Sequence, residues 1–203
     1  MAIVIINSMT YASNGPGVCG LRTVFLDRDG VVNEKLPEGR YVRSWNEFHL
    51  LSGVPEGIAR LNRAGLRVLV VSNQRGISLG LYSDSDVLAI HSKLLRELKN
   101  YSAHIDGFYY CPHDENMCDC RKPSPGLFKQ AVAEFPNITS QDSVMIGDSV
   151  SDMEFARRLG MGALFIEGDS KRQKPGLEKA RELAGRCYGS LLDAVDYLLG
   201  ENA

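Results

Sequence analysis

The pattern of apolar and polar residues along the chain alternates between two kinds of segment. Short apolar runs, rich in β-branched residues, predict buried strands at Thr23–Leu26, Arg67–Val71, Gly107–Tyr110, Ser143–Ile146 and Ala163–Ile166. Apolar residues at helical spacing predict helices at Val54–Ala64, Ser83–Lys99, Pro125–Phe135, Ser151–Leu159 and Leu191–Leu199. Because strands and helices alternate, we expect an α/β fold: a Rossmann-like, doubly wound parallel sheet with helices on both faces.

Polar clusters follow several of the predicted strands. Asp27 and Asp29 come after the first strand, residues 72–74 after the second, a cysteine-rich segment after the third and Asp148 after the fourth. Ligands of parallel sheets bind beyond the carboxyl ends of the strands. We therefore expect these clusters to converge on one site.

Length and charge restrict the classes of protein to consider. The chain has 203 residues, which suits one domain, and we place that domain at residues 23–203 after an N-terminal extension at 1–22. A net charge of -2 gives no electrostatic reason to expect nucleic acid or an anionic membrane as a partner. No apolar run approaches the ~20 residues of a spanning helix, and the N-terminus lacks a basic region typical of a signal peptide. We expect a cytoplasmic monomer.

The segment FLDRDGVVNE, Phe25 to Glu34, carries two carboxylates at i and i+2. One of them can attack a phosphorus atom, and the other can protonate the departing alkoxide and later deprotonate water. Asp29 can serve as the acid only if its surroundings favour the protonated form. A solvated acidic turn is the alternative interpretation of an isolated pair.

Three further segments suit a phosphate site. In VVSNQRG, Ser72 and backbone N–H groups can donate to phosphate, although Ser-Asn also occurs in ordinary turns. In RKPSPG, Lys122 offers a compact positive charge, or else belongs to a surface turn. In MIGDSVSDM, Asp148 and Asp152 are suitable oxygen ligands for Mg²⁺, or else acids at an ordinary helix N-terminus.

Taken in order, DRDG, SN, KP and GDSVSD resemble the motifs of the haloacid-dehalogenase (HAD) phosphatases, and the resemblance covers Thr23 to Leu199. It implies that Asp27 is the nucleophile, Asp29 the general acid/base, and Ser72 and Lys122 the groups that stabilise the phosphoryl group. It also implies that Mg²⁺ is bound by Asp27, Asp148 and the backbone carbonyl of Asp29, with Asp152 in support or as an accessory ligand. The short interval between Asp27 and Ser72 leaves no room for a large cap domain.

The cysteine-rich segment CPHDENMCDC is a candidate metal site. Cys111, His113, Cys118 and Cys120 form a complete tetrahedral zinc set with no open position, which predicts structural Zn²⁺ in a small loop at 111–120. Four reduced, unliganded side chains are the alternative. A zinc-bound nucleic-acid module is disfavoured because no basic, aromatic-rich surface accompanies the ligands.

This zinc loop is similar to that of a HAD subgroup that contains heptose bisphosphate phosphatases and histidinol-phosphate phosphatases. NQRGISLGLYS and YYCPH are similar to the heptose enzymes, whereas the short zinc loop is closer to the histidinol type. We expect hydrolysis of the 7-phosphate of D-glycero-D-manno-heptose 1,7-bisphosphate, with histidinol phosphate or another small sugar or polyol phosphate as the alternative substrate. A non-catalytic binding module and a nucleic-acid end phosphatase are less favoured. The expected substrate-binding residues are Asn73, Gln74, Arg75, Arg121, Glu38, Gly39, Arg40 and Tyr41.

Other residues are expected to have ordinary structural roles. His49, His91 and His104 are isolated, which favours surface or packing positions over metal ligation. Cys19 and Cys187 are expected to be unpaired. The basic run Lys171, Arg172 and Lys174 is expected to be a solvated loop.

Overall fold

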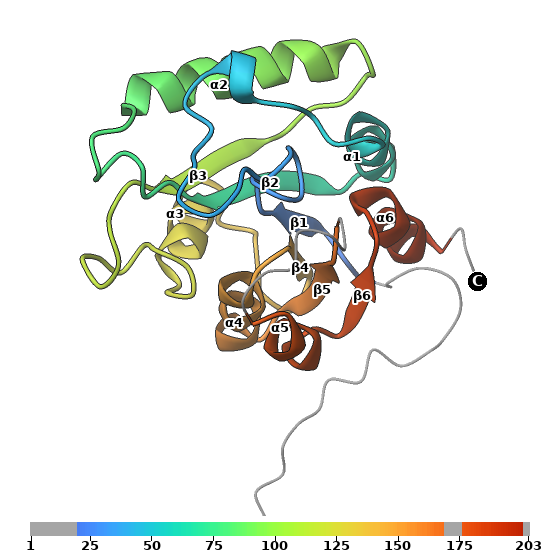
Figure 1. Cartoon of the computed structure of the whole chain (residues 1–203). Coiled ribbons are helices and arrows are strands. Elements are labelled where there is room, and N and C mark those ends of the chain that lie inside the picture. Colours follow the sequence, from blue (N-terminus) through green and yellow to red (C-terminus); the bar gives the residue numbers. More distant parts are fainter. Residues whose placement is uncertain (1–19, 169–175, 201–203) are drawn as a thin grey trace, which may run out of the picture.

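Six parallel strands form a single sheet in the order β3-β2-β1-β4-β5-β6 (Figure 1). The computed structural model describes residues 20–168 and 176–200. The strands are β1 Thr23–Leu26, β2 Arg67–Asn73, β3 Gly107–Cys111, β4 Ser143–Gly147, β5 Gly162–Ile166 and β6 Arg186–Tyr188. This is the doubly wound α/β fold that the sequence predicts.

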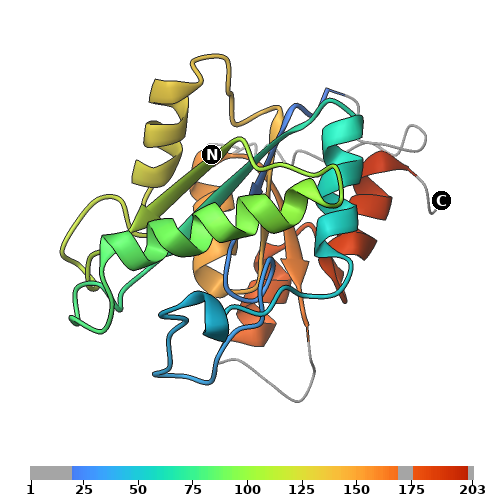
Figure 2. The same ribbon diagram turned by 90° about the horizontal axis from the view of Figure 1, so that it is seen from above.

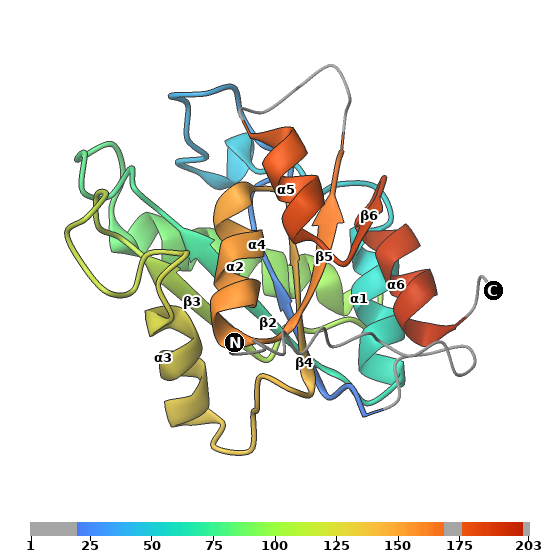
Figure 3. The ribbon, with the colours of Figure 1, turned by 90° about the horizontal axis from the view of Figure 1, so that it is seen from below.

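Helices cover both faces of the sheet. They are α1 Val54–Arg63, α2 Asp84–Lys99, α3 Gly126–Glu134, α4 Val150–Leu159, α5 Leu177–Leu183 and α6 Leu191–Leu199, with a 3₁₀ turn at Trp45–Glu47. Seen from above, α1, α2 and α6 lie over one face of the sheet (Figure 2). Seen from below, α3, α4 and α5 lie over the other (Figure 3).

The core follows the period-two alternation of buried strands. In β1, Val24 and Leu26 belong to the apolar cluster beneath α1, α2 and α6. Phe25, between them, belongs to the opposite cluster with Leu127 of α3 and Phe155 of α4. Both faces of β1 are therefore fully buried, which explains why its sequence is a continuous apolar run.

The direction of winding reverses at the centre of the sheet. From β1 the chain proceeds outward through β2 to β3, then returns to β4 on the other side of β1 and continues to β5 and β6. Asp27 follows β1 and Asp148 follows β4, so both lie at the reversal, where open α/β sheets bind their ligands. No helix in the described residues has both the length and the apolar character needed to cross a bilayer.

The predicted elements agree with the structure apart from their ends and the C-terminal region. Helix α5, strand β6 and the 3₁₀ turn were not predicted. Residues 1–19, which include Cys19, and the basic run at 171–174 lie outside the described residues. Cys187 is a free, exposed thiol, as expected. The domain boundary, the cellular location and the oligomeric state stay predictions.

His91 of α2 is buried between the helix and the sheet, in keeping with the expected packing role. Its ring stacks on Phe108 at a centroid distance of 4.1 Å and meets Tyr110 edge-on. Burial, helped by the positive charge of Arg28 and opposed by Asp29, lowers the pKa of His91 to about 3. The imidazole is therefore neutral in the folded protein.

This burial makes a prediction about stability against pH. In the unfolded chain His91 binds a proton below its ordinary pKa of 6.5, whereas in the folded protein it stays neutral down to about pH 3. The free energy of unfolding therefore falls as the pH falls between these values. At pH 5 the loss from this residue is about 2 kcal/mol. Urea unfolding measures the free energy of unfolding at pH 7.5 and pH 5. Between these two pH values, His91→Leu should gain about this much free energy relative to the wild type. The control His104→Gln, at an exposed histidine, should show no such gain. If the difference in unfolding free energy between His91→Leu and the wild type were the same at both pH values, the low pKa of His91 would be contradicted.

Candidate active site

A cavity of about 340 Å³ lies at the carboxyl ends of β1, β2 and β4. It brings together residues from segments that are far apart in sequence, between positions 27 and 152. Its lining includes Asp27, Asp29, Lys35, Ser72, Asn73, Gln74, Arg75, Tyr82, Arg121, Lys122, Asp152 and residues 36–42. The convergence expected from the strand ends is thus present in the structure, while the roles of the individual residues stay predictions.

Lys122 is the charged centre of this cavity. Its Nζ donates to Asp27 Oδ1 at 2.8 Å and to the Val71 carbonyl at 2.6 Å, and lies 2.6 Å from Asp152 Oδ1. Its side chain is only 1% exposed. Burial alone would lower the pKa of Lys122, but Asp152 and Asp27 outweigh it and hold that pKa above its ordinary value. The ammonium is therefore a fixed positive charge beside the predicted nucleophile.

The backbone of Lys122 is held by Asn73 at the end of β2. The Asn73 side chain accepts from the Lys122 N–H at 2.9 Å and donates to the Lys122 carbonyl at 3.0 Å. This two-bond clamp fixes the loop that carries the lysine to the strand that carries Ser72. Asn73, which we expected to bind substrate, therefore has a positioning contact in addition to its place in the cavity lining.

Asp27, Asp148 and Asp152 form a buried acidic cluster. One carboxylate oxygen from each lies within 4.8 Å of the others. Burial raises the pKa of Asp27, and Asp152 adds to this, while Lys122 and Lys35 oppose it. Lys35 lies 3.3 Å from both oxygens of Asp148. Oxygen ligands at this spacing, rich in negative charge, suit Mg²⁺.

Gly30 allows the loop after β1 to pass directly against this cluster. Its φ is +105°, and a Cβ at this position would overlap the Asp148 carboxylate. The turn that carries Asp29 and the end of β4 can approach one another only because residue 30 has no side chain.

Asp29 lies in surroundings that favour its ionised form. Its carboxylate accepts from Arg28 Nη2 at 2.9 and 3.0 Å, from Asn33 at 3.0 Å and from Gln74 at 3.0 Å. Burial alone would raise the pKa of Asp29, but the charge of Arg28 and these hydrogen bonds hold it below its ordinary value. The condition for an acid role is not met in this arrangement, in which Asp29 is instead ready to accept a proton.

The predicted substrate residues line the same cavity, with different partners. The segment 38–41 forms part of the rim. Arg75 forms an ion pair with Asp114 at 2.6 Å, which ties the loop after β2 to the cysteine-rich loop. Arg121 lies 3.7 Å from Glu115, and its Nη1 is buried without a hydrogen-bond partner among the described residues. That unmatched donor suits an anionic group of a ligand.

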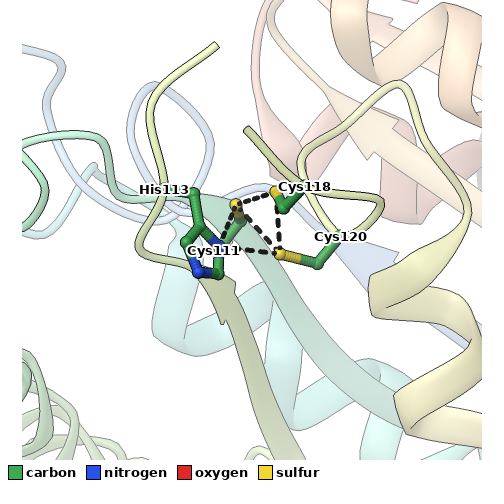
Figure 4. Close-up of side chains that lie close together, drawn as sticks. All are labelled: Cys111, His113, Cys118 and Cys120. Carbon is green, nitrogen blue, oxygen red and sulfur yellow. Dashed lines mark hydrogen bonds between the residues drawn. The ribbon is translucent and has the colours of Figure 1, made fainter. Parts of the chain in front are cut away.

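Cys111, His113, Cys118 and Cys120 point toward a common centre beside the cavity (Figure 4). The sulfur–sulfur distances are 3.1 to 3.4 Å, and His113 Nδ1 lies 3.3 Å from Cys120. A zinc tetrahedron needs sulfur–sulfur edges of about 3.8 Å, roughly half an ångström longer. Although burial opposes it, hydrogen bonds from Cys120 and the Arg121 backbone lower the pKa of Cys118 to about 6, which suits a thiolate ligand. The donor set fits a metal ion.

Three contributors to the site were missed from the sequence. Arg28 is fully buried and pairs with Asp29, Lys35 pairs with Asp148, and Tyr82 hydrogen-bonds to Gln74. Arg28 stands inside the DRDG motif, so its position beside two acids was an available signal. Lys35 and Tyr82 lie in irregular segments, where the sequence pattern gives no indication of direction.

Comparison with known proteins supports the chemistry of this geometry. A family model described as HAD-hydrolase-like matches residues 119–193. D-glycero-alpha-D-manno-heptose-1,7-bisphosphate 7-phosphatase of Mycobacterium tuberculosis is 40% identical over 141 residues, which cover 69% of this chain and 74% of that protein. D-glycero-beta-D-manno-heptose-1,7-bisphosphate 7-phosphatase of Vibrio cholerae is 36% identical over 184 residues, 87% of this chain and 95% of that protein. The chain belongs to the HAD phosphatases.

A solved HAD phosphatase shares the overall architecture. D,D-heptose 1,7-bisphosphate phosphatase from B. bronchiseptica, complexed with magnesium and phosphate, matches with a TM-score of 0.77 and 29% identity. The match covers 89% of this chain and 99% of that one. The expected membership of the HAD family, and the expected fold, are therefore confirmed.

The buried Lys122 network generates a prediction about stability. Lys122→Met leaves Asp27 and Asp152 buried without their counter-charge, which should lower the free energy of unfolding by about 3–5 kcal/mol. Adding Asp152→Asn removes one of the two stranded charges and should restore a large part of that loss. Chemical denaturation without divalent cations measures both variants. No recovery in the double variant would contradict the coupling of Lys122 to Asp152.

Proposed function

We propose that the chain is a Mg²⁺-dependent phosphomonoesterase that removes the 7-phosphate of D-glycero-D-manno-heptose 1,7-bisphosphate. The observation that carries the proposal is that Asp27 and Lys122 meet in one cavity and that Asp148 belongs to the same acidic cluster as Asp27. Two relatives that are similar to this chain over most of its length support the choice of substrate. One is named as a phosphatase of the α anomer and the other as a phosphatase of the β anomer.

In the proposed reaction Asp27 attacks the phosphorus atom and the sugar alkoxide leaves, giving an aspartyl phosphate and a sugar. Asp29 then takes a proton from water, which attacks the phosphorus atom and regenerates Asp27 with release of inorganic phosphate. The ionised state of Asp29 suits this second step. For the first step Asp29 must carry a proton to the leaving oxygen, so it has to gain that proton before or during substrate binding.

Lys122 and Ser72 supply the electrostatic part of the reaction. Lys122 is already fixed 2.8 Å from the Asp27 carboxylate and can compensate charge on the phosphoryl oxygens. Asp27, Asp148 and the backbone carbonyl of Asp29 would hold Mg²⁺, with Asp152 in support. When bound, Mg²⁺ neutralises phosphate charge during transfer.

The rim of the cavity suits a second anionic group on the substrate. The unmatched Nη1 of Arg121 and the nearby Arg40 can bind a 1-phosphate of a bisphosphate. Histidinol phosphate has no second phosphate and would leave these donors without a partner. This difference favours the heptose bisphosphate over histidinol phosphate.

The nucleophile assignment predicts the effect of one substitution. Asp27→Asn should lower phosphate release by at least about 10³-fold, because an amide is a poor nucleophile. The thermal unfolding midpoint should stay equal to or above that of the wild type, since one buried negative charge is removed. Phosphate release with Mg²⁺ measures the first effect, and retained turnover would refute the mechanism.

Substrate choice is tested with a matched panel. The α and β anomers of D-glycero-D-manno-heptose 1,7-bisphosphate, histidinol phosphate and a heptose 7-monophosphate should be compared by kcat/KM. We expect at least about tenfold preference for a bisphosphate over the monophosphate, with Arg121→Met removing most of it. Equal values for mono- and bisphosphates would contradict the second anionic site.

We also propose that Cys111, His113, Cys118 and Cys120 hold one structural Zn²⁺. Metal analysis of protein purified without chelator should find about one Zn per chain, and Cys118→Ser should reduce this content. Because the loop leads directly to Arg121 and Lys122, Cys118→Ser should clearly raise the KM for the substrate. The same substitution should have only a small effect on the unfolding midpoint. Cys187→Ser, at an exposed free thiol, is the control. Zinc-free wild type with normal activity would defeat this proposal.

A further inference from the structure

The side-chain amide of Gln74 connects three polar groups in the wall of the cavity. Its Nε2 donates to Ser72 Oγ at 2.7 Å and to Asp29 Oδ2 at 3.0 Å. Its Oε1 accepts from the Tyr82 hydroxyl at 2.7 Å. Gln74 lines the cavity but is only 2% exposed, and its polar atoms are engaged by these three partners. These contacts fit a support for Ser72 and Asp29 better than the substrate contact expected from the sequence.

The chemistry of its partners fixes which way this amide faces. An ionised carboxylate only accepts hydrogen bonds, so Asp29 requires the NH₂ end of Gln74. The Tyr82 hydroxyl can donate to the remaining carbonyl end. Without that donor, the buried Oε1 loses its partner, and the energetic difference between the two orientations of the amide becomes smaller.

The orientation of the amide decides what the Ser72 hydroxyl can do. Because Gln74 donates to Ser72 Oγ, the serine O–H is not used for Gln74, and within the described part of the chain it has no acceptor of its own. Ser72 lines the cavity. If the amide turned over, Ser72 would donate its proton to Gln74 Oε1, and the hydroxyl would no longer be a donor toward the cavity.

Tyr82 is held firmly enough to set this orientation. Gly76 packs against its ring so closely that a Cβ there would overlap it. The backbone N–H of Gln74 donates to the Cys111 carbonyl at 2.7 Å, which fixes the other end of the contact. Burial, opposed by Arg28, raises the pKa of Tyr82 to about 12, so its O–H remains available as a donor.

We propose that Tyr82 is a positioning residue for the phosphatase reaction: through Gln74, its hydroxyl keeps the Ser72 O–H directed at the transferring phosphoryl group. This inference rests on the proposed function. The Tyr82 hydroxyl donates to Gln74 rather than to Ser72 or to a residue of the acidic cluster. Its contribution is the direction of a hydrogen bond two side chains away.

The test compares Tyr82→Phe with Tyr109→Phe. Each variant removes one tyrosine hydroxyl from a residue that is 8% exposed, but the Tyr109 hydroxyl donates to Glu134, away from the cavity. We expect Tyr82→Phe to lower kcat about tenfold and to raise the Kd of inorganic phosphate, measured with Mg²⁺ by calorimetry, several-fold. Tyr109→Phe should change neither quantity by more than about twofold, with similar unfolding midpoints for both variants.

A double-mutant cycle with Ser72→Ala separates positioning from general destabilisation. In the Ser72→Ala background, Tyr82→Phe should change phosphate affinity by less than about twofold, because the hydroxyl that it directs is gone. Additive effects, or a Tyr82→Phe variant equal to the wild type, overturn the proposal. If the wild type releases no phosphate from any substrate, the proposed function fails, and the phosphate-binding cycle still decides the role of Tyr82.

Discussion

The candidate site depends on one buried ammonium that balances acids from the segments that follow two different strands. Lys122 Nζ lies between Asp27, which follows β1, and Asp152, near the start of α4 after β4. Removing the ammonium would leave both carboxylates without their counter-charge in a region with little exposure to water, at a cost of several kcal/mol. The relative position of β1, β4 and the loop after β3 is therefore set by electrostatics as well as by apolar packing.

The same contact explains why the supporting residues are polar and only partly exposed. Asn73 clamps the backbone of Lys122, and Ser149 donates to Asp152 through its hydroxyl and its N–H. Asn73 fixes the backbone of the residue that carries the positive charge, and Ser149 fixes a carboxylate that faces it. Such a network holds the predicted nucleophile and its counter-charge in place before a ligand arrives, which reduces the reorganisation that the proposed reaction requires.

The sequence was most informative where local pattern and chemistry coincide. Continuous apolar runs identified β1 and β4 because both of their faces are buried, and each ends in an acid at the same edge of the sheet. β6 was missed because its three residues are mostly exposed and show no apolar run. α5 has only seven residues between Gly176 and Gly185, too few for a clear helical period. Arg28 pairs with its sequence neighbour Asp29 and could have been recognised within the DRDG motif. The contact of Tyr82 with Gln74 joins irregular segments, whose direction the sequence pattern does not indicate.

The loops around the cavity are joined to one another at the surface rather than through the core. Arg75 and Asp114 form a partly exposed ion pair, and the Ser78 N–H donates to the Pro112 carbonyl. The predicted reactive groups stand at or near strand ends, while the rim consists of irregular segments. Replacement of the rim alone would therefore exchange one phosphorylated metabolite for another without disturbing bond cleavage, so evolution can diversify such a scaffold by altering its border first.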